Sequence, residues 1–332
     1  MVIEQPYLLF LGDAPDELAA KTAFGVFEWR PDACIGQVRL PGCIPKLDLP
    51  EMSLSQGVGQ GAKTLLIGVA NRGGVIPDAW QGPLMEALRH GLDIASGLHT
   101  RLSDISVLHG AARRLGRKLH DVRHPEGPFV VGSGKKRCGR RLLTVGTDCS
   151  VGKMYTALAL YKAMQTRGIK ADFRATGQTG IFIQGDGVSV DAVVADFISG
   201  AIEQLCPEND SDHWDLIEGQ GSLFHPSFAG VSLGLLHGAQ PDVLVLCHEP
   251  TRTHMRGLSH QPLPSLHDCI DANLSAARLV NAEVRFAGVA INTKVLDEQD
   301  SESLLHQTED SLGLPCVDPV RTGVDKLVDN LS

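Results

Sequence analysis

The stretch LLTVGTDCSVGKMYTALAL, residues 142–160, constrains the fold of this chain more than any other. An apolar strand pattern leads into a glycine-rich turn, and a lysine then opens a helical pattern. Such a turn directs backbone N–H groups and a helix N-terminus into one concavity, to which the lysine adds positive charge. Five residues separate the two glycines, one more than in the common phosphate-binding loop. The alternative is a structural turn with a surface lysine. We predict an α/β domain whose phosphate site is formed by Gly146, Thr147, Asp148, Cys149, Ser150, Val151, Gly152 and Lys153.

Met154 follows the lysine where a nucleotide-hydrolysing loop carries the Ser or Thr that holds Mg²⁺. A thioether cannot replace that hydroxyl, and Thr156 lies about 200° further around a helix. The loop is therefore expected to grip a pyrophosphate without organising a metal, which favours a ligand such as coenzyme A. Two alternatives stay open. One is an ATP-dependent ligase or kinase in which Asp148, Glu218 and water hold the metal, and the other is a non-catalytic nucleotide-binding module.

Strand-like and helix-like segments alternate along the 332 residues. Buried-strand patterns at 7–12 and 63–74 precede helical patterns at about 78–90 and 105–116. After the phosphate loop, four segments read as strands that end in polar or glycine residues: 169–177, 213–222, 241–250 and 284–294. This alternation indicates parallel sheets covered on both faces. We predict two α/β domains, each a parallel sheet flanked by helices: a Rossmann-like domain at 1–133 and a P-loop domain at 134–332.

Composition narrows the range of partners. The formal net charge of −9 argues against a nucleic-acid surface, which needs clustered Lys and Arg. The one basic cluster, residues 134–141, is interpreted as a solvated linker, with binding of a ligand phosphate as the alternative. Eight scattered cysteines without a C-x-x-C pair indicate reduced thiols and a cytoplasmic protein. Neither a signal peptide nor a membrane span is expected, and the apolar content suggests a homodimer.

Glu218 and His225 are the candidate catalytic residues. In WDLIEGQGSLFHP, residues 214–226, Glu218 ends an apolar strand and a glycine turn leads to His225. Ligands of open α/β sheets bind outside the carboxyl ends of the strands, so either side chain could deprotonate an amine there. The alternatives are a carboxylate that caps a helix or fixes the glycine turn, and a histidine that only structures its loop.

Four further residues are candidates for substrate binding: Arg174, Gln178, Arg252 and Arg256. Arg174 and Gln178 lie at another strand end, while Arg252 and Arg256 are close enough in sequence to grip a dicarboxylate bidentately. Ordinary surface charges are the alternative. Asn292, in INTK, resembles a base-recognition element, with a simple turn as the alternative. His248 and His254 lack a carboxylate or cysteine at ligand spacing, so no metal site is predicted.

Several of these motifs resemble known families. GTDCSVGK is similar to the phosphate loop of dethiobiotin synthetase, and LIEGQGS and INTK resemble the acid-glycine and adenine-binding elements of that fold. Over nearly its full length, including IEGQGSLFHP and SGLHTRL, the chain resembles a two-domain bacterial family whose members are assigned as D-glutamate N-acetyltransferases.

The resemblance implies an acyltransferase that moves an acetyl group from acetyl-CoA to the amine of D-glutamate, in D-amino-acid catabolism. It implies that residues 146–153 cradle the cofactor phosphates, and Met154 and Asn292 complete the predicted cofactor-binding set. Met154 departs from dethiobiotin synthetase; this departure counts against the use of ATP, and it is one that an acetyl-CoA user could tolerate. The expected partners are therefore these two small molecules, with no metal required.

Overall fold

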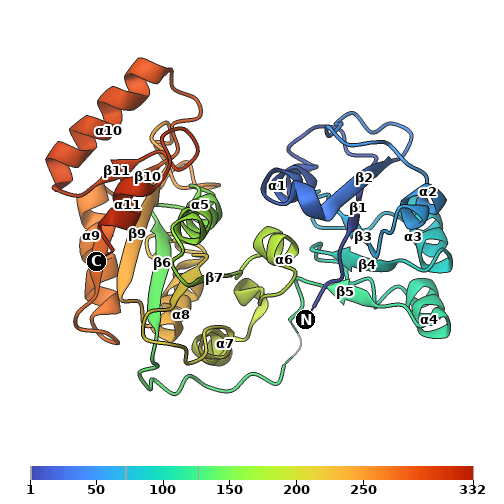
Figure 1. Ribbon diagram of the computed structural model, residues 1–332, viewed down its shortest axis with the longest axis horizontal. Coiled ribbons are helices and arrows are strands. Elements are labelled where there is room, and N and C mark those ends of the chain that lie inside the picture. The colour runs from blue at the N-terminus through green and yellow to red at the C-terminus, as the bar shows by residue number, and fades with distance from the viewer. Residues whose placement is uncertain (1, 72, 126, 332) are drawn as a thin grey trace. The chain divides into compact units, whose positions relative to one another are not determined.

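The chain forms two compact units in a computed structural model that describes residues 2–71, 73–125 and 127–331 (Figure 1). The first unit comprises Met1–Glu126 and Gly177–Ala192, and the second comprises Gly127–Thr176 and Val193–Ser332. The predicted domains, 1–133 and 134–332, differ from these units in two places. Residues 127–133 belong to the second unit, and residues 177–192 return to the first.

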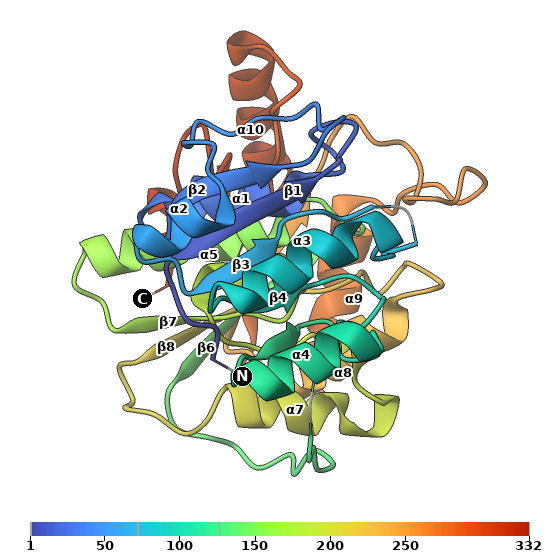
Figure 2. The ribbon, with the colours of Figure 1, turned by 90° about the vertical axis from the view of Figure 1, so that its right-hand side faces the viewer.

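The first unit contains a five-stranded parallel sheet in the order β2-β1-β3-β4-β5. Its strands are β1 (Tyr7–Gly12), β2 (Cys34–Arg39), β3 (Thr64–Ile67), β4 (Asp93–Ser96) and β5 (Leu119–Asp121). Its α-helices are α1 (Lys21–Trp29), α2 (Leu54–Gly59), α3 (Asp78–Arg89), α4 (Ser106–Leu115) and α6 (Gln178–Gln184). Every residue of β1, β3 and β4 is buried, as a sheet covered on both faces requires. Figure 2 shows α3 and α4 along one face of this sheet.

Helix α6 belongs to the first unit because its apolar residues and its C-terminal carbonyls find partners there. Ile181, Phe182 and Ile183 are buried. The Tyr7 hydroxyl donates to the carbonyl of Phe182 at 3.0 Å, and Arg30 Nη1 donates to the carbonyl of Ile183 at 3.0 Å. These donors satisfy carbonyls that the end of a short helix leaves unpaired.

The second unit contains a six-stranded parallel sheet in the order β11-β10-β9-β6-β8-β7. Its strands are β6 (Arg140–Gly146), β7 (Ala171–Arg174), β8 (Trp214–Ile217), β9 (Val243–His248), β10 (Arg285–Ile291) and β11 (Cys316–Val317). Its α-helices are α5 (Lys153–Thr166), α7 (Ile198–Leu205), α8 (Ala229–Ala239), α9 (Leu266–Ala277), α10 (Glu298–Leu312) and α11 (Asp325–Asp329). The central strands β6, β8 and β9 bring their carboxyl ends together, which is where such sheets bind ligands.

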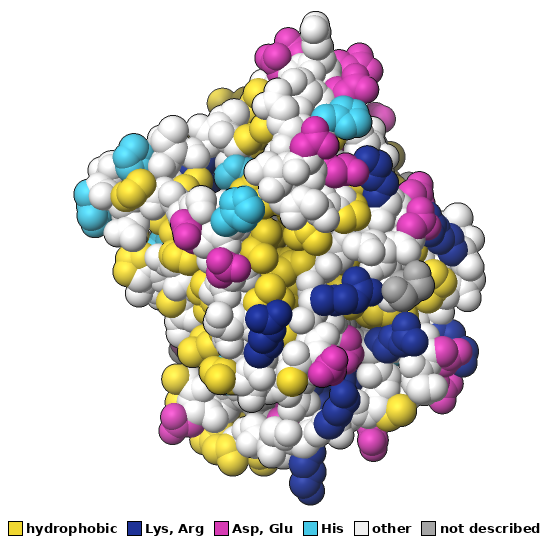
Figure 3. All heavy atoms as spheres, turned by 90° about the vertical axis from the view of Figure 1, so that its left-hand side faces the viewer, with side chains coloured by type: hydrophobic (Ala, Val, Ile, Leu, Met, Phe, Trp, Pro, Cys, Tyr) yellow, Lys and Arg dark blue, Asp and Glu magenta, His cyan; other side chains and the backbone are white. Residues whose placement is uncertain are grey.

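Three short 3-10 helices, Pro31–Ala33, Val190–Ala192 and Ala195–Phe197, complete the elements of the described residues, and charge is unevenly distributed over the surface. Figure 3 shows Asp and Glu side chains gathered on α10 at the top of one face. Helix α10 begins at the N-cap Asp297, whose side chain accepts from Asp300 N, and Glu298 and Asp300 lie in its first turn. Negative charge at a helix N-terminus is favourable, so these residues stabilise the helix they begin. Within the described residues, no helix combines the length and apolarity needed to cross a membrane.

The basic cluster at residues 134–141 is not simply a solvated linker. Arg137 donates to carbonyls at the ends of α7 and α8, including Cys206 O at 2.6 Å and Gly238 O at 2.6 Å. Arg141 is 1% exposed, and its backbone N–H donates to Asp242 Oδ2 at 2.9 Å. Two of its arginines therefore cap helix ends and fix the first strand of the sheet, a role that no local sequence pattern indicates. Lys135 and Lys136 are exposed, as a linker would have them.

Candidate functional site

The phosphate loop lies between the end of β6 and the start of α5, as the sequence predicts. Gly152 has φ +105° and precedes the first residue of α5, Lys153. A Cβ on Gly146 would lie 2.9 Å from Lys153 Nζ and 2.9 Å from the carbonyl of Asp148, so glycine is needed there for space. Ser150 has φ +54°, which turns the loop sharply before the helix.

Lys153 is buried beneath the loop. Its ammonium donates to the carbonyl of Asp148 at 2.8 Å, and the residue is 6% exposed. Burial lowers the pKa of Lys153. The nearby negative charges of Asp148 and Glu218 favour the protonated form of the lysine, but they only partly offset the effect of burial. An anion bound in the concavity would add to that favourable charge, so the lysine is suited to bind a phosphate.

The side chain of Asp148 is fully buried, and its carboxylate is bound on both oxygens. Oδ1 accepts from the N–H of Cys149 at 2.6 Å. Oδ2 accepts from Arg252 Nη1 at 2.6 Å and from the backbone N–H of Arg256 at 2.7 Å. A carboxylate paired with a guanidinium in this way has little capacity left for a magnesium ion. This counts against the alternative in which Asp148 takes over as the metal ligand.

Arg252 and Arg256 both lie against the phosphate loop. Arg252 Nη1 also donates to the carbonyl of Cys149 at 2.7 Å, and Arg252 Nε lies 3.6 Å from a carboxylate oxygen of Glu249. The guanidinium of Arg256 contacts the Ser150 hydroxyl. The structure therefore brings together two of the four predicted substrate-binding residues, and it brings them to the loop.

Glu218 follows β8 and lies beside the same loop. The residue is 4% exposed, and its Oε2 accepts from the N–H of Thr176 at 3.0 Å. The Thr176 hydroxyl in turn donates to the backbone carbonyl of Glu218 at 2.5 Å. Next along the chain, a Cβ on Gly219 would lie 1.7 Å from the carbonyl of Thr144 and 3.0 Å from Lys153 Cδ. The glycine thus permits close contact between the turn after Glu218, the strand β6 and the buried lysine.

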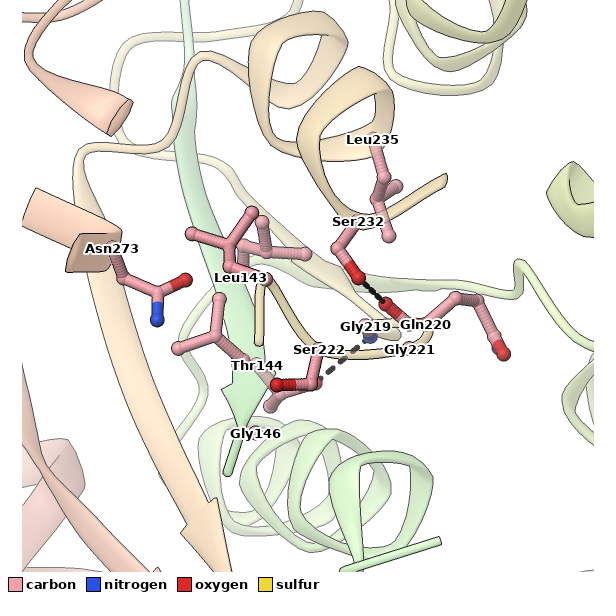
Figure 4. A pocket seen from close by; sticks show the side chains of 12 residues that line it. Leu143, Thr144, Gly146, Gly219, Gln220, Gly221, Ser222, Ser232, Leu235 and Asn273 are labelled. Carbon is pink, nitrogen blue, oxygen red and sulfur yellow. Dashed lines mark hydrogen bonds between the residues drawn. The ribbon is translucent and has the colours of Figure 1, made fainter. Parts of the chain in front are cut away.

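A small cavity lies behind this glycine turn (Figure 4). In it, Gly219 N donates to the Thr144 hydroxyl at 3.0 Å, and the Ser232 hydroxyl donates to the carbonyl of Gln220 at 2.7 Å. Its free volume of about 10 Å³ is roughly what one water molecule needs. A substrate does not fit there. Nearer the loop, the Ser222 hydroxyl donates to the carbonyl of Thr147 at 3.1 Å and ties the turn to the phosphate site.

A larger groove of about 390 Å³ lies beside α10 and contains none of the loop residues. Its lining includes Leu305, Val317, Arg321 and Lys326. The groove is therefore separate from the phosphate site, and none of the predicted site residues lines it.

His225 is buried next to the loop, with both ring nitrogens engaged. Nδ1 accepts from the N–H of Ser227 at 3.2 Å, which leaves Nε2 to donate to the carbonyl of Arg256 at 3.1 Å. The ring also packs on Phe228, with centroids 4.5 Å apart. This arrangement matches the alternative in which the histidine structures its loop, because neither nitrogen is left to accept a proton from a substrate.

The remaining predicted residues lie elsewhere. Arg174 Nε pairs with Asp215 at 2.7 Å, and its Nη2 pairs with Asp172 at 3.0 Å, so two carboxylates already neutralise it. Gln178 is the first residue of α6 in the first unit, where it packs against Gly97. Asn292 follows β10, and its side-chain oxygen accepts from the N–H of Lys294 at 3.2 Å, which is the turn interaction of the alternative interpretation.

Two clusters place possible metal-binding atoms within 4.8 Å of one another: Asp148 with Cys149 and His225, and Asp172 with His213 and Asp215. In the first cluster Arg252 pairs with Asp148, and in the second Arg174 pairs with both carboxylates. A guanidinium within each cluster opposes a second cation. Among the described residues, each carboxylate of the two clusters is thus paired with an arginine.

The predicted loop residue Thr147 pairs with His248, which the sequence suggested only as a possible metal ligand, and Thr293 pairs with Asp318, two residues that the sequence did not single out. The Thr147 hydroxyl lies 3.1 Å from His248 Nδ1, and burial lowers the pKa of His248. Asp318, after β11, accepts from the N–H and the hydroxyl of Thr293. The available signal was their position, since each lies at or just after the carboxyl end of a parallel strand or in the phosphate loop.

Two family models match the chain. One is described as a domain of unknown function (DUF1611_C), a P-loop domain, and matches residues 129–328. The other is described as a domain of unknown function (DUF1611_N), a Rossmann-like domain, and matches residues 40–125. Together they confirm the predicted α/β architecture of a Rossmann-like part followed by a P-loop part.

Curated relatives and a solved structure match along the whole chain. A protein of Tritonibacter scottomollicae named D-glutamate N-acetyltransferase is 57% identical over 100% of this chain and 99% of its own. A protein of a Pseudoalteromonas species with the same name is 50% identical over 100% of both chains. The crystal structure of a DUF1611 family protein from Anabaena variabilis has a TM-score of 0.86 and is 34% identical, covering 98% of this chain and 99% of its own.

Proposed function

Since this chain belongs to the DUF1611 family and is at least 50% identical over its full length to two relatives named D-glutamate N-acetyltransferase, we propose that it acetylates the amino group of D-glutamate. The donor is acetyl-CoA, bound with its phosphates at the loop between β6 and α5. The observation that carries the choice of donor is a phosphate loop with a buried lysine and no metal-binding hydroxyl after it.

The loop supports a phosphate-bearing donor whose phosphates do not react. Lys153 and the N–H groups at the start of α5 supply positive potential for phosphate oxygens. Met154 takes the place of the magnesium-binding residue, and the Thr156 hydroxyl donates to the carbonyl of Gly152 at 3.0 Å, where it is buried. Asp148 is paired with Arg252. These features fit a ligand that is held by its phosphates and transfers a group from its thioester.

Acetyl transfer requires a neutral amine, attack on the thioester carbonyl and release of the CoA thiol. A base takes the proton from the amine, and backbone N–H groups stabilise the oxyanion of the tetrahedral intermediate. Glu218 is the proposed base, since a buried carboxylate beside the loop can take up a proton from the amine. Because the pantetheine arm separates the thioester from the phosphates, this role requires the arm to fold back across the turn at 219–222.

The product assay uses purified protein, acetyl-CoA and a panel of D- and L-amino acids, with chelator or with magnesium. We expect CoA thiol release that depends on D-glutamate and is unaffected by chelator, together with formation of N-acetyl-D-glutamate. Absence of thiol release with every amino acid, combined with magnesium-dependent formation of ADP from ATP, would instead support the ligase or kinase alternative.

A further inference from the structure

The segment that follows β9, residues 249–257, is tied to the phosphate loop at several points; we call it the arginine segment. Arg252 binds Asp148 and the carbonyl of Cys149, and the backbone N–H of Arg256 binds Asp148. On the other side, His225 Nε2 donates to the carbonyl of Arg256. The backbone N–H and the backbone carbonyl of Arg256 are therefore both hydrogen-bonded, and these two bonds hold residue 256 next to the phosphate loop.

The two arginines of this segment are used differently. Arg252 is mostly buried, with its side chain 21% exposed, and it directs its Nη1 hydrogens at a carboxylate and a carbonyl of the loop. This arginine holds the loop in shape. Arg256 is exposed, and its guanidinium contacts the Ser150 hydroxyl through Nη1. Within the described part of the chain, its Nε and Nη2 groups bind no other residue, so these donors are available to a ligand at the loop.

The charges around the loop favour a polyanion. Lys153, Arg252 and Arg256 contribute three positive charges, and the fully buried Asp148 offsets the charge of Arg252. In a metal-using loop, a magnesium ion would neutralise part of the phosphate charge. In this chain Met154 lies where the magnesium-binding hydroxyl would be, and Arg256, which has unpaired donors within the described residues, contacts the loop at Ser150. Arginine binds phosphate oxygens bidentately, which a lysine cannot do.

We propose that Arg256 is a phosphate ligand for the acetyl donor, supplying the cation that a metal-using loop obtains from magnesium. Asp148 and His225 are positioning residues that hold the peptide of Arg256, and Arg252 fixes the shape of the loop. This inference rests on the proposed function, because it takes acetyl-CoA as the ligand. It replaces the prediction that Arg256 grips a carboxylate of the amino-acid substrate.

The test measures the Kd of CoA by calorimetry in the presence of EDTA, and the KM of each substrate, for the full-length protein and two variants. R256Q keeps the backbone bonds to Asp148 and His225 and replaces the guanidinium by a shorter, neutral amide. R278Q is the matched control, because Arg278 is exposed at the end of α9 and, among the described residues, its side chain forms no hydrogen bond or ion pair with the loop. Loss of a charge-assisted hydrogen bond predicts CoA binding weakened roughly 10- to 100-fold in R256Q. The KM of D-glutamate and the properties of R278Q should not change.

Dephospho-CoA, which lacks the 3′-phosphate, identifies the phosphate involved. If R256Q and the wild type bind dephospho-CoA equally, Arg256 contacts the 3′-phosphate; if R256Q still binds it more weakly, the contact is to the pyrophosphate. Unchanged CoA binding in a folded R256Q protein, or a rise only in the KM of D-glutamate, would overturn the inference and leave acetyl transfer intact. A wild-type protein that does not bind CoA would instead overturn the proposed function, and the inference with it.

Discussion

At the scale of single residues, the hydrogen-bond partners of the polar side chains at the site limit what each side chain can do. The sequence placed Glu218, His225, Arg252 and Arg256 near one sheet edge, and all four do lie beside the phosphate loop. It could not show their partners, which come from distant parts of the chain. His225 bonds to residue 256, for example, so its engagement depends on a loop that follows a different strand. Their predicted catalytic and binding roles stay predictions.

The replacement of Glu218 by Gln tests the proposed base directly. The amide keeps an oxygen that can accept from Thr176 N but cannot take a proton from the amine. We expect kcat to fall roughly 10²- to 10⁴-fold, with little change in the KM of acetyl-CoA. The control is E283Q, since Glu283 is exposed and precedes β10. If E218Q turned over at the wild-type rate, Glu218 would not be the base, and its role would be to fix the glycine turn.

At the scale of elements, the apolar pattern of the sequence predicts where strands and helices lie. It does not predict the contacts at their ends, because these are hydrogen bonds between residues far apart in the sequence. The predicted strand at 7–12 is β1, and the predicted helix at 78–90 is α3, Asp78–Arg89. The sequence did not predict that α6 belongs to the first unit. The seven residues of this helix contain no pattern that indicates which of the two sheets the helix packs against. The buried arginines of the basic cluster were missed for the same reason: their partners are helix ends far away in sequence.

Asp318 provides a pH-dependent link between the ends of β10 and β11. Burial on its own would raise the pKa of Asp318, but hydrogen bonds from Thr293 and from the N–H groups of Val320 and Arg321 outweigh it, and the pKa is lowered. Because the folded-state pKa lies below the unfolded-state value, this stabilisation is complete at neutral pH. It is lost as pH falls below about 4, through the folded-state pKa.

We expect D318N to lower the free energy of unfolding at pH 7 by about 1–3 kcal/mol, because the amide is a weaker acceptor for these donors. On acidification from pH 5 to pH 3, the variant should lose less stability than the wild type, as measured by urea unfolding at each pH. Parallel losses in the two proteins would show that Asp318 does not contribute to acid sensitivity. D271N serves as the control, since Asp271 is exposed in the middle of α9.

At the scale of the whole molecule, the two units are not consecutive pieces of sequence. The family models and the parallel sheets confirm the predicted fold class, and relatives named D-glutamate N-acetyltransferase confirm the resemblance. The return of residues 177–192 to the first unit was not predicted, because alternation of strands and helices does not reveal which sheet a helix covers. The chain therefore crosses between the units more than once.

This crossing predicts how fragments behave. Residues 127–332 expressed alone carry α6 without Tyr7 and Arg30, so Ile181 and Phe182 lose their buried surroundings. We expect this fragment to bind a dye for exposed apolar surface and to aggregate. Replacing residues 178–184 by a glycine-serine linker in the same fragment should reduce both effects. A 127–332 fragment that stays monomeric and binds no dye would show that α6 does not need the first unit.

The measurement that most directly tests the central claim, a phosphate loop that holds an acyl donor without a metal, is calorimetric binding of CoA and ATP to the wild-type protein and K153M. We expect CoA to bind with the same Kd in EDTA and in magnesium, and K153M, which removes the buried ammonium of the loop, to abolish binding. Magnesium-dependent ATP binding tighter than CoA binding would contradict the account, because Met154 and the paired Asp148 would then have failed to exclude the metal.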